Sequence, residues 1–149
     1  MKDALRSTVF RGGLATLVVT LVVGCGQSGL ELFPVQGQVM LDGKPLADAG
    51  VTFLPAEKGP SASGTTDTDG RFELMTTNSI GAIRGTHSVV IAKRKYVPIK
   101  PGEEPVPGGL RAEWYSPKKY ANPSTSGLSA DVGEGDNKFD FELSSKESR

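Results

Sequence analysis

The stretch that decides the fold is residues 35–74, VQGQVMLDGKPLADAGVTFLPAEKGPSASGTTDTDGRFEL. Apolar and polar residues alternate in its short runs, and turn residues such as Asp-Gly separate these runs. Alternation is typical of strands with one buried face, because successive side chains point to opposite faces of a sheet. Turns about every 8–12 residues are typical of an all-β sandwich or barrel. Four strands are therefore expected, at 35–41, 51–54, 63–67 and 71–75.

The middle of the chain predicts one long strand and then irregular structure. The strand is expected at 85–95, with His87, Val89 and Ile91 on one face. Residues 98–109 are rich in proline and glycine and predict a loop, because proline cannot donate to a strand ladder. A short helical turn is expected at 110–115.

The alternating pattern returns near the C-terminus and completes the expected fold. Strands are predicted at 128–132 and 139–143, joined by a hairpin turn over 133–136. Residues 35–143 would then form one seven-stranded antiparallel sandwich, and residues 144–149 a frayed tail. Two antiparallel sheets can supply a hydrophobic core of this size without disulfides.

The first 24 residues have the composition of a secretory signal peptide. Three basic residues and Asp3 precede an apolar run at 14–23, and the basic residues are Lys2, Arg6 and Arg11. The run is too short for a transmembrane helix, which needs about 20 apolar residues. A basic start followed by a short apolar core is typical of a signal peptide, which lies outside the folded domain.

The end of this apolar run, Val22-Val23-Gly24-Cys25, resembles the lipobox of bacterial lipoproteins. Val22 stands where that pattern usually has leucine. The resemblance implies that residues 1–24 are removed and that Cys25 carries lipid at the start of a flexible linker, 25–34. An ordinary signal peptide followed by an unrelated cysteine is the alternative.

Lipidation of Cys25 would make the membrane a partner and place the protein in the cell envelope, facing the periplasm or the cell surface. More than one acyl chain gives stable anchoring, because each buried methylene contributes about 0.8 kcal/mol. Gly26, rather than aspartate, follows the cysteine. By the sorting rule of some envelope lipoproteins, this favours the outer membrane.

Charge and composition exclude several classes of function. The whole chain has 17 basic and 17 acidic residues. Residues 1–24 hold three basic residues and one acidic residue, so removing them leaves 14 basic and 16 acidic residues, a net charge of −2. We therefore expect no long-range electrostatic preference and no nucleic-acid partner, which would need a basic face. With one cysteine and one histidine, the chain is expected to hold no internal disulfide, catalytic site, metal or cofactor.

Several motifs, taken in order, resemble a carboxypeptidase regulatory-like domain: GQV at 37–39, DGKPL at 42–46, AGVTF at 49–53, GTTDTDGRF at 64–72 and GTHSVVI at 85–91. The C-terminal segments YANP at 120–123, TSGL at 125–128 and NKFDFEL at 137–143 resemble short bacterial lipoproteins built from one such domain. The resemblance implies a transthyretin-like (prealbumin-like) Greek-key sandwich. His87 departs from it, because the family usually has an aromatic residue, often tyrosine, at that place.

The resemblance implies a non-catalytic, lipid-anchored envelope protein whose sandwich is a binding or structural module. The alternatives are an oligomeric carrier of a small ligand and an accessory subunit of an envelope peptidase or other enzyme. Two enzyme families with related folds do not fit the single histidine of this chain. Hydroxyisourate hydrolases need several histidines, and intradiol dioxygenases need two histidines with two tyrosines.

Three aromatic residues, Trp114, Tyr115 and Tyr120, are the candidate binding residues. They follow the predicted loop, and binding residues are often placed on loops carried by a rigid scaffold. Exposed rings could stack on an envelope polysaccharide or anchor a partner protein. The alternative is that they cap an open end of the sandwich as part of its core.

Three further features have both a structural and a functional interpretation. His87 is interpreted as a half-buried residue at the edge of the core rather than as a general base. Residues 67–70, Asp-Thr-Asp-Gly, are interpreted as a tight turn. They lack the third ligand before the glycine and the final glutamate of a helix-loop-helix calcium site. The basic runs at 93–95 and 118–119 suit either solvent or an anionic envelope polymer.

Overall fold

The structure is a computed structural model that describes residues 30–102, 104 and 107–146. The predicted signal peptide and Cys25 lie outside the described residues. Within the described part of the chain, no helix is both long enough and apolar enough to span a membrane.

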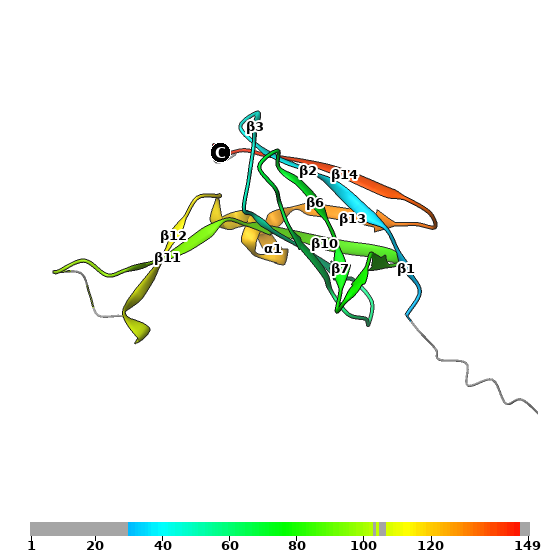
Figure 1. Ribbon diagram of the computed structural model, residues 1–149, viewed down its shortest axis with the longest axis horizontal. Helices are drawn as coiled ribbons and strands as arrows, with labels where there is room; N and C mark the ends of the chain where they lie inside the picture. The colour runs from blue at the N-terminus through cyan, green and yellow to red at the C-terminus, as the bar shows by residue number, and fades with distance from the viewer. Residues whose placement is uncertain (1–29, 103, 105–106, 147–149) are drawn as a thin grey trace, which may run out of the picture.

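Two β-sheets form the body of the molecule (Figure 1). The first sheet has six strands in the spatial order β13-β10-β4-β5-β7-β8. Their bounds are Leu128–Val132, Gly85–Ala92, Gly50–Pro55, Ala62–Thr65, Met75–Thr76 and Ser79–Ile80. In the second sheet β2 lies between β14 and β3 and also pairs with β6. The bounds of this sheet are Val35–Leu41 for β2, Asn137–Leu143 for β14, Lys44–Pro45 for β3 and Arg71–Glu73 for β6. The predicted all-β sandwich is therefore confirmed.

The remaining elements are short. Strand β1 (Leu32–Phe33) pairs with β9 (Ala82–Ile83), and β11 (Arg94–Pro98) pairs with β12 (Leu110–Trp114). The helical segments are η1 (Pro107–Gly109), η2 (Lys118–Ala121) and α1 (Pro123–Ser126).

The core follows from the alternating pattern. Phe53 lies at its centre and is fully buried. Its ring centroid is 6.4 Å from that of Phe72, 5.7 Å from that of Phe139 and 6.1 Å from that of Phe141. These rings come from both sheets, so the aromatic cluster joins the two layers. The aliphatic residues around it include Val39, Val51, Leu74, Val89, Ile91 and Leu143.

One ladder differs from the antiparallel arrangement that the sequence predicted. Strands β2 and β14 pair in parallel, from Val35 opposite Asn137 to Leu41 opposite Leu143. Parallel neighbours need a long connection, and here the rest of the domain provides it. The two strands approach closely at Gly37, where a Cβ atom would lie 1.7 Å from the carbonyl oxygen of Phe139. Only glycine fits at that position.

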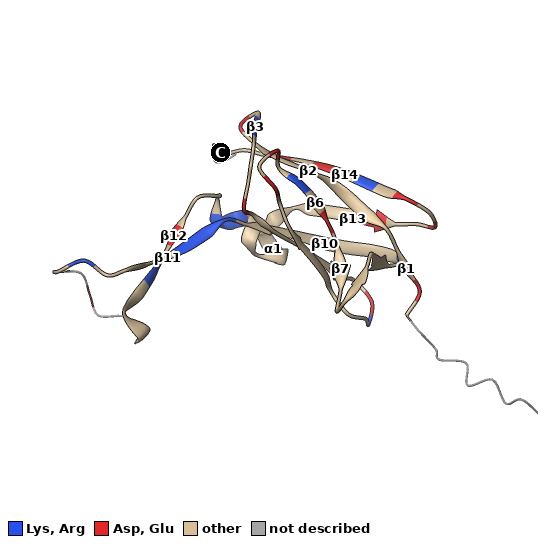
Figure 2. Cartoon of the chain, in the orientation of Figure 1, with Lys and Arg blue, Asp and Glu red and all other residues tan. Residues whose placement is uncertain are grey.

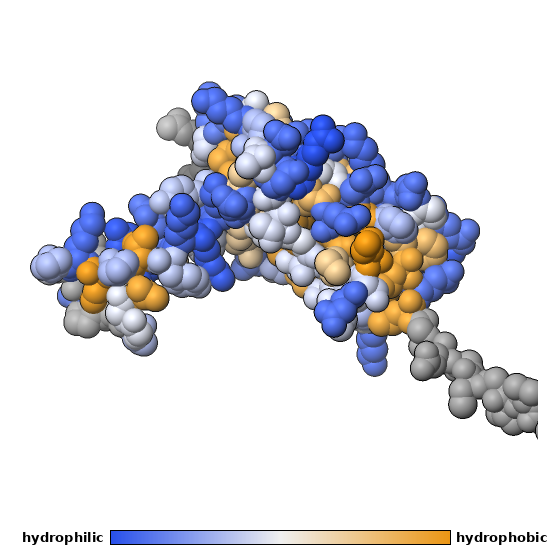
Figure 3. All heavy atoms as spheres, in the orientation of Figure 1, coloured by the Kyte–Doolittle hydropathy of each residue, from blue (hydrophilic) through white to orange (hydrophobic). Residues whose placement is uncertain are grey.

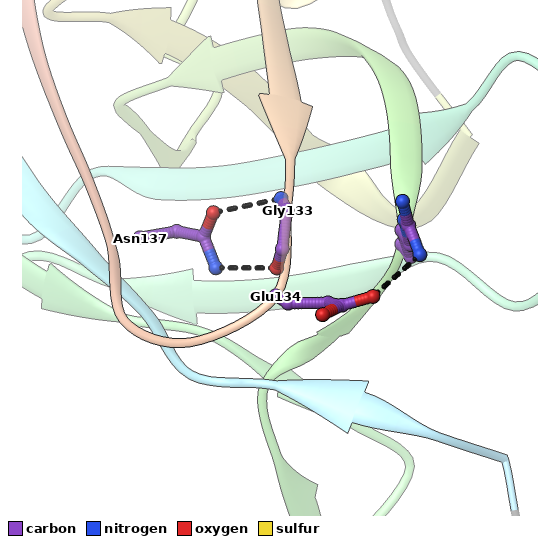
Figure 4. Close-up of polar contacts among 4 residues, drawn as sticks. Gly133, Glu134 and Asn137 are labelled. Carbon is purple, nitrogen blue, oxygen red and sulfur yellow. Dashed lines mark hydrogen bonds and ion pairs between the residues drawn. The ribbon is translucent and has the colours of Figure 1, made fainter.

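Asn137 fixes the turn that leads from β13 into β14 (Figure 4). The hairpin predicted at 133–136 is wrong, because β13 pairs with β10 in the first sheet and β14 pairs with β2 in the second. The amide oxygen of Asn137 accepts a hydrogen bond of 2.9 Å from the backbone N–H of Gly133. Its amide nitrogen donates to the carbonyl oxygens of Gly133 and Gly135 at 3.1 Å and 2.9 Å. An exposed ion pair of 2.7 Å between Arg84 and Glu134 lies beside this turn.

The predicted strand at 85–95 is interrupted, and this changes the next segment. Strand β10 ends at Ala92, and β11 leaves the sandwich to form a projecting two-stranded ribbon with β12 (Figure 1). The predicted helical turn at 110–115 is wrong, because these residues form β12 and pair with β11. The register runs from Arg94 opposite Trp114 to Pro98 opposite Leu110.

Candidate functional site

The β11–β12 ribbon is the most distinctive surface feature of the described chain. It extends from the end of the sandwich opposite β1, where the chain arrives from the N-terminus (Figure 1). Its base is fixed by hydrogen bonds between Lys93 and the segment after β12. The backbone N–H of Lys93 donates to Oγ of the buried Ser116 at 2.8 Å, and the backbone N–H of Tyr115 donates to the Lys93 carbonyl at 2.8 Å.

One face of the ribbon is aromatic and apolar but not covered by the sandwich. Residues directly opposite each other in an antiparallel pair share a face. The register therefore places Arg94, Tyr96, Pro98, Leu110, Ala112 and Trp114 on this face. Tyr96 is 59% exposed and Leu110 47% exposed. Figure 3 shows apolar groups between hydrophilic ones on the projecting part of the molecule.

Cations lie over the rings of this face. The Arg94 guanidinium carbon is 5.5 Å from the ring centroid of Tyr96 and 5.5 Å from that of Trp114. Nζ of Lys118 is 5.8 Å from the Trp114 centroid. Such cation–π contacts contribute about 0.5–1 kcal/mol at exposed sites. They orient the cations without neutralising them.

The opposite face repeats this arrangement with Lys95 and Tyr115. Nζ of Lys95 is 5.5 Å from the Tyr115 ring centroid, and Tyr115 is 44% exposed. The Tyr115 hydroxyl donates a hydrogen bond of 3.1 Å to the Glu113 carboxylate. This hydrogen bond raises the pKa of Tyr115, and the negative charge of Glu113 acts in the same direction.

The basic residues are concentrated on and around the ribbon (Figure 2). Residues 93–119 contain seven basic and three acidic residues, a net charge of +4. The rest of the chain from residue 25 contains seven basic and 13 acidic residues, a net charge of −6. The small net charge of the mature chain is therefore the sum of two regions with opposite net charge. Counting charges by segment, rather than over the whole chain, would have revealed this.

The three aromatic candidates do not form one cluster. Trp114 ends β12 and Tyr115 follows it, so both belong to the ribbon. Tyr120 lies in η2, is only 7% exposed and belongs to the hydrophobic core. Its hydroxyl accepts a hydrogen bond of 3.1 Å from the backbone N–H of Ser144. For Tyr120, the structure supports the core interpretation.

His87 is also part of the interior, with 1% of its surface exposed. Its Nδ1 lies 2.8 Å from the Gly85 carbonyl oxygen. A carbonyl oxygen only accepts hydrogen bonds, so Nδ1 carries the proton. Nε2 is buried and has no hydrogen-bond partner among the described residues. The ring packs 5.8 Å from that of Phe53. This position suits a core residue and gives a substrate no access.

The Asp-Thr-Asp-Gly segment is a turn. One carboxylate oxygen of Asp67 accepts hydrogen bonds from the backbone N–H groups of Asp69 at 2.9 Å and Arg71 at 2.8 Å. Gly70 has a φ of +74°, which favours glycine. Among the described residues, no group of three or more histidine, cysteine, aspartate or glutamate side chains is placed to hold a metal ion.

No family model matches this chain, and no curated protein matches it. Among solved structures, it is similar to a 9R-lipoxygenase from Cyanothece PCC8801, with a TM-score of 0.39 and 16% identity over 76% of this chain. The chain spans only 16% of that lipoxygenase. It is also similar to the dioxygenase domain of a dioxygenase–carbohydrate-binding protein fusion from Streptomyces sp. SirexAA-E. There the TM-score is 0.34, the identity is 22%, and coverage is 78% of this chain and 83% of that chain. Both TM-scores are too low to support an argument about function.

Proposed function

We propose that this chain is a non-catalytic, lipid-anchored protein of the bacterial cell envelope whose sandwich presents the β11–β12 ribbon to a binding partner. One observation carries the proposal. The ribbon contributes no residue to the buried core, yet it displays Tyr96, Leu110 and Tyr115 to solvent. Two-stranded ribbons are only marginally stable alone. An exposed aromatic ribbon on a well-packed scaffold is therefore better suited to binding than to supporting the fold.

The lipobox resemblance indicates which end of the sandwich would face the membrane. Leu32, the first residue of β1, is seven positions after Cys25 in the sequence. Such a segment spans at most about 25 Å when fully extended. A lipid on Cys25 would keep the β1 end of the sandwich near the membrane, and the ribbon would extend from the opposite end (Figure 1).

The resemblance to carboxypeptidase regulatory-like domains supports a non-catalytic role. The motif DGKPL at 42–46 contains the turn between β2 and β3, and the motif GTTDTDGRF at 64–72 contains the turn that leads into β6. The matching residues thus build turns and strands. The one histidine within them is buried.

The anchor is tested by fractionating cells that produce the full chain or its Cys25→Ala variant. The native chain should sediment with membranes and be released by detergent. The variant should appear in the soluble fraction of the envelope or remain as an unprocessed precursor, which its larger mass identifies. A processed Cys25→Ala protein that still sediments with membranes would show that the lipobox interpretation is wrong.

Binding is tested with the unlipidated mature chain, residues 25–149 carrying Cys25→Ser, and an insoluble envelope fraction. The Tyr96→Ser, Trp114→Ala double variant should lose retention on this fraction without losing the folded sandwich. The Ile80→Ser variant is the matched control, because Ile80 is another exposed large apolar residue but lies on β8, outside the ribbon. Equal retention of all three proteins would overturn the binding role of the ribbon.

A further inference from the structure

We propose that the ligand of the ribbon is an acidic polysaccharide, a polymer whose sugars carry carboxylate or phosphate groups. This inference rests on the proposed function, because it names the partner of the same surface. It follows from four cationic side chains at and beside the ribbon base: Arg94, Lys95, Lys118 and Lys119. Nothing else on the described surface combines so many cations with aromatic rings.

The four cations are held in place but keep their charge. Arg94, Lys95 and Lys118 lie over the rings of the ribbon, and Nζ of Lys119 lies 4.8 Å from the Tyr120 centroid. The ion pairs Arg84–Glu134, Lys93–Asp48 and Lys138–Asp140 involve none of these four cations. Glu113 is directly opposite Lys95 in the ladder, but its carboxylate accepts the hydrogen bond of Tyr115.

This geometry favours an anion over a neutral sugar. A guanidinium that lies over a ring keeps N–H groups available at its edge, where a carboxylate or phosphate binds in a bidentate manner. The rings of Tyr96, Trp114 and Tyr115 already have a cation over them, so they offer less open surface for stacking a neutral sugar. The aromatic residues therefore position the cations, and the cations would contact the ligand.

The distribution of charge favours a polymer that approaches from outside. The ribbon segment 93–119 carries a net charge of +4 and the remaining mature chain −6. A polyanion is attracted to the ribbon and repelled by the sandwich, so it would meet the molecule at this end. An anchor at Cys25 would direct the ribbon away from the anionic headgroups of its own membrane. The protein would then link that membrane to a polymer beyond it.

The test uses the fluorescence of Trp114, the single tryptophan of the chain, in the Cys25→Ser mature protein. Polygalacturonate is the acidic probe, dextran of matched length is the neutral probe, and vesicles containing phosphatidylglycerol are the lipid probe. Polygalacturonate should change the fluorescence in a saturable manner, and dextran should not. The affinity should fall at least about tenfold between 50 and 500 mM salt, because counterions screen the contacts.

The Arg94→Gln, Lys118→Gln double variant should bind polygalacturonate about 10–100-fold more weakly, a loss of about 1.4–2.7 kcal/mol, because it removes two of the cations that would contact the anionic groups. The matched control is Lys44→Gln, Lys58→Gln, which removes two exposed cations outside the ribbon and should bind as the native chain does. Unchanged melting temperatures show that the variants remain folded.

Failure of the acidic-polysaccharide proposal can be distinguished from failure of the proposed binding function. Equal binding of dextran, binding to vesicles in preference to polygalacturonate, or no loss in the Arg94, Lys118 variant would overturn the acidic-polysaccharide ligand. If the aromatic variants still lose retention on the envelope fraction, the proposed binding function survives any of these results. If polygalacturonate does not bind and the Tyr96→Ser, Trp114→Ala variant is also retained on the envelope fraction like the native chain, both proposals are overturned.

Discussion

Arg94 and Trp114 lie directly opposite each other in the β11–β12 ladder, with 5.5 Å between the guanidinium carbon and the ring centroid. This pair is at the base of the ribbon, where the chain leaves β10. The contact links the two strands through their side chains as well as through their backbones. A cation is therefore held at the point where the ribbon joins the sandwich.

The Trp114→Ala variant should loosen the ribbon and leave the sandwich unchanged. The variant loses the cation–π contacts of Arg94 and Lys118, which contribute about 0.5–1 kcal/mol each at an exposed site. Amide hydrogens of 94–97 and 110–114 should therefore exchange up to about 30 times faster, as measured by hydrogen–deuterium exchange. Amides of β10 are the internal control. Equal acceleration in β10 would contradict the separation of ribbon and core.

The Tyr115–Glu113 hydrogen bond should be visible in an alkaline titration. It raises the pKa of Tyr115 above its ordinary value of 10.0, because the neutral hydroxyl is the donor. The contact is therefore complete below pH 10 and is lost as the pH rises through the raised pKa. Absorbance near 295 nm should show that Glu113→Gln lowers the pH at which one tyrosine ionises. Tyr115→Phe identifies that tyrosine, and an unchanged curve would contradict the contact.

Two substitutions of His87 should differ sharply in stability. His87→Ala removes a fully buried ring, and buried aromatic-to-alanine changes cost about 3 kcal/mol or more. His87→Phe keeps the contact with Phe53 and removes the unpartnered Nε2, but it loses the hydrogen bond to Gly85. Its free energy of unfolding should stay within about 1 kcal/mol of the native value. Urea unfolding measures both, and equal losses would show that the hydrogen bond dominates.

Phe141→Ala should be among the most destabilising changes in the second sheet. The ring is 8% exposed and packs against Phe53 and Phe72. Its loss should lower the free energy of unfolding by about 3–5 kcal/mol. Asp140→Ala, on the exposed face of the same strand, is the control and should change it by less than about 0.5 kcal/mol. A loss below about 1 kcal/mol for Phe141→Ala would contradict its place in the core.

Much of the sandwich was predictable because its signals are local. Alternation over a few residues decides which face of a strand is apolar, so Val35, Val39, Val89 and Ile91 were expected inside and are buried. The turn at 67–70 was predictable for the same reason. Its signals lie within the turn, because Asp67 accepts a hydrogen bond from the backbone of Asp69 and Gly70 has a positive φ. Gln38 and Val39 of β2 then add hydrogen bonds to the turn.

The candidate site was predictable only in part. Trp114 and Tyr115 were identified as candidate binding residues, but the sequence could not separate them from Tyr120. Tyr120 is buried by packing in the core, and its hydroxyl accepts a hydrogen bond from the backbone of Ser144, 24 residues away along the chain. The basic runs near these aromatic residues were visible in the sequence. The sequence did not predict that strand pairing places Arg94 over the ring of Trp114, which is 20 residues later in the chain.

By itself, the sequence determined the all-β class, most strand positions and the inward-facing residues, because each depends on neighbours within one strand or turn. Only the tertiary structure decided that β14 pairs with β2 in parallel and that 110–114 is a strand. The backbone N–H and C=O groups of a strand are satisfied by another strand, whose identity and direction are not encoded in the local pattern. The ribbon, and with it the grouping of cations over aromatic rings, exists only through that pairing.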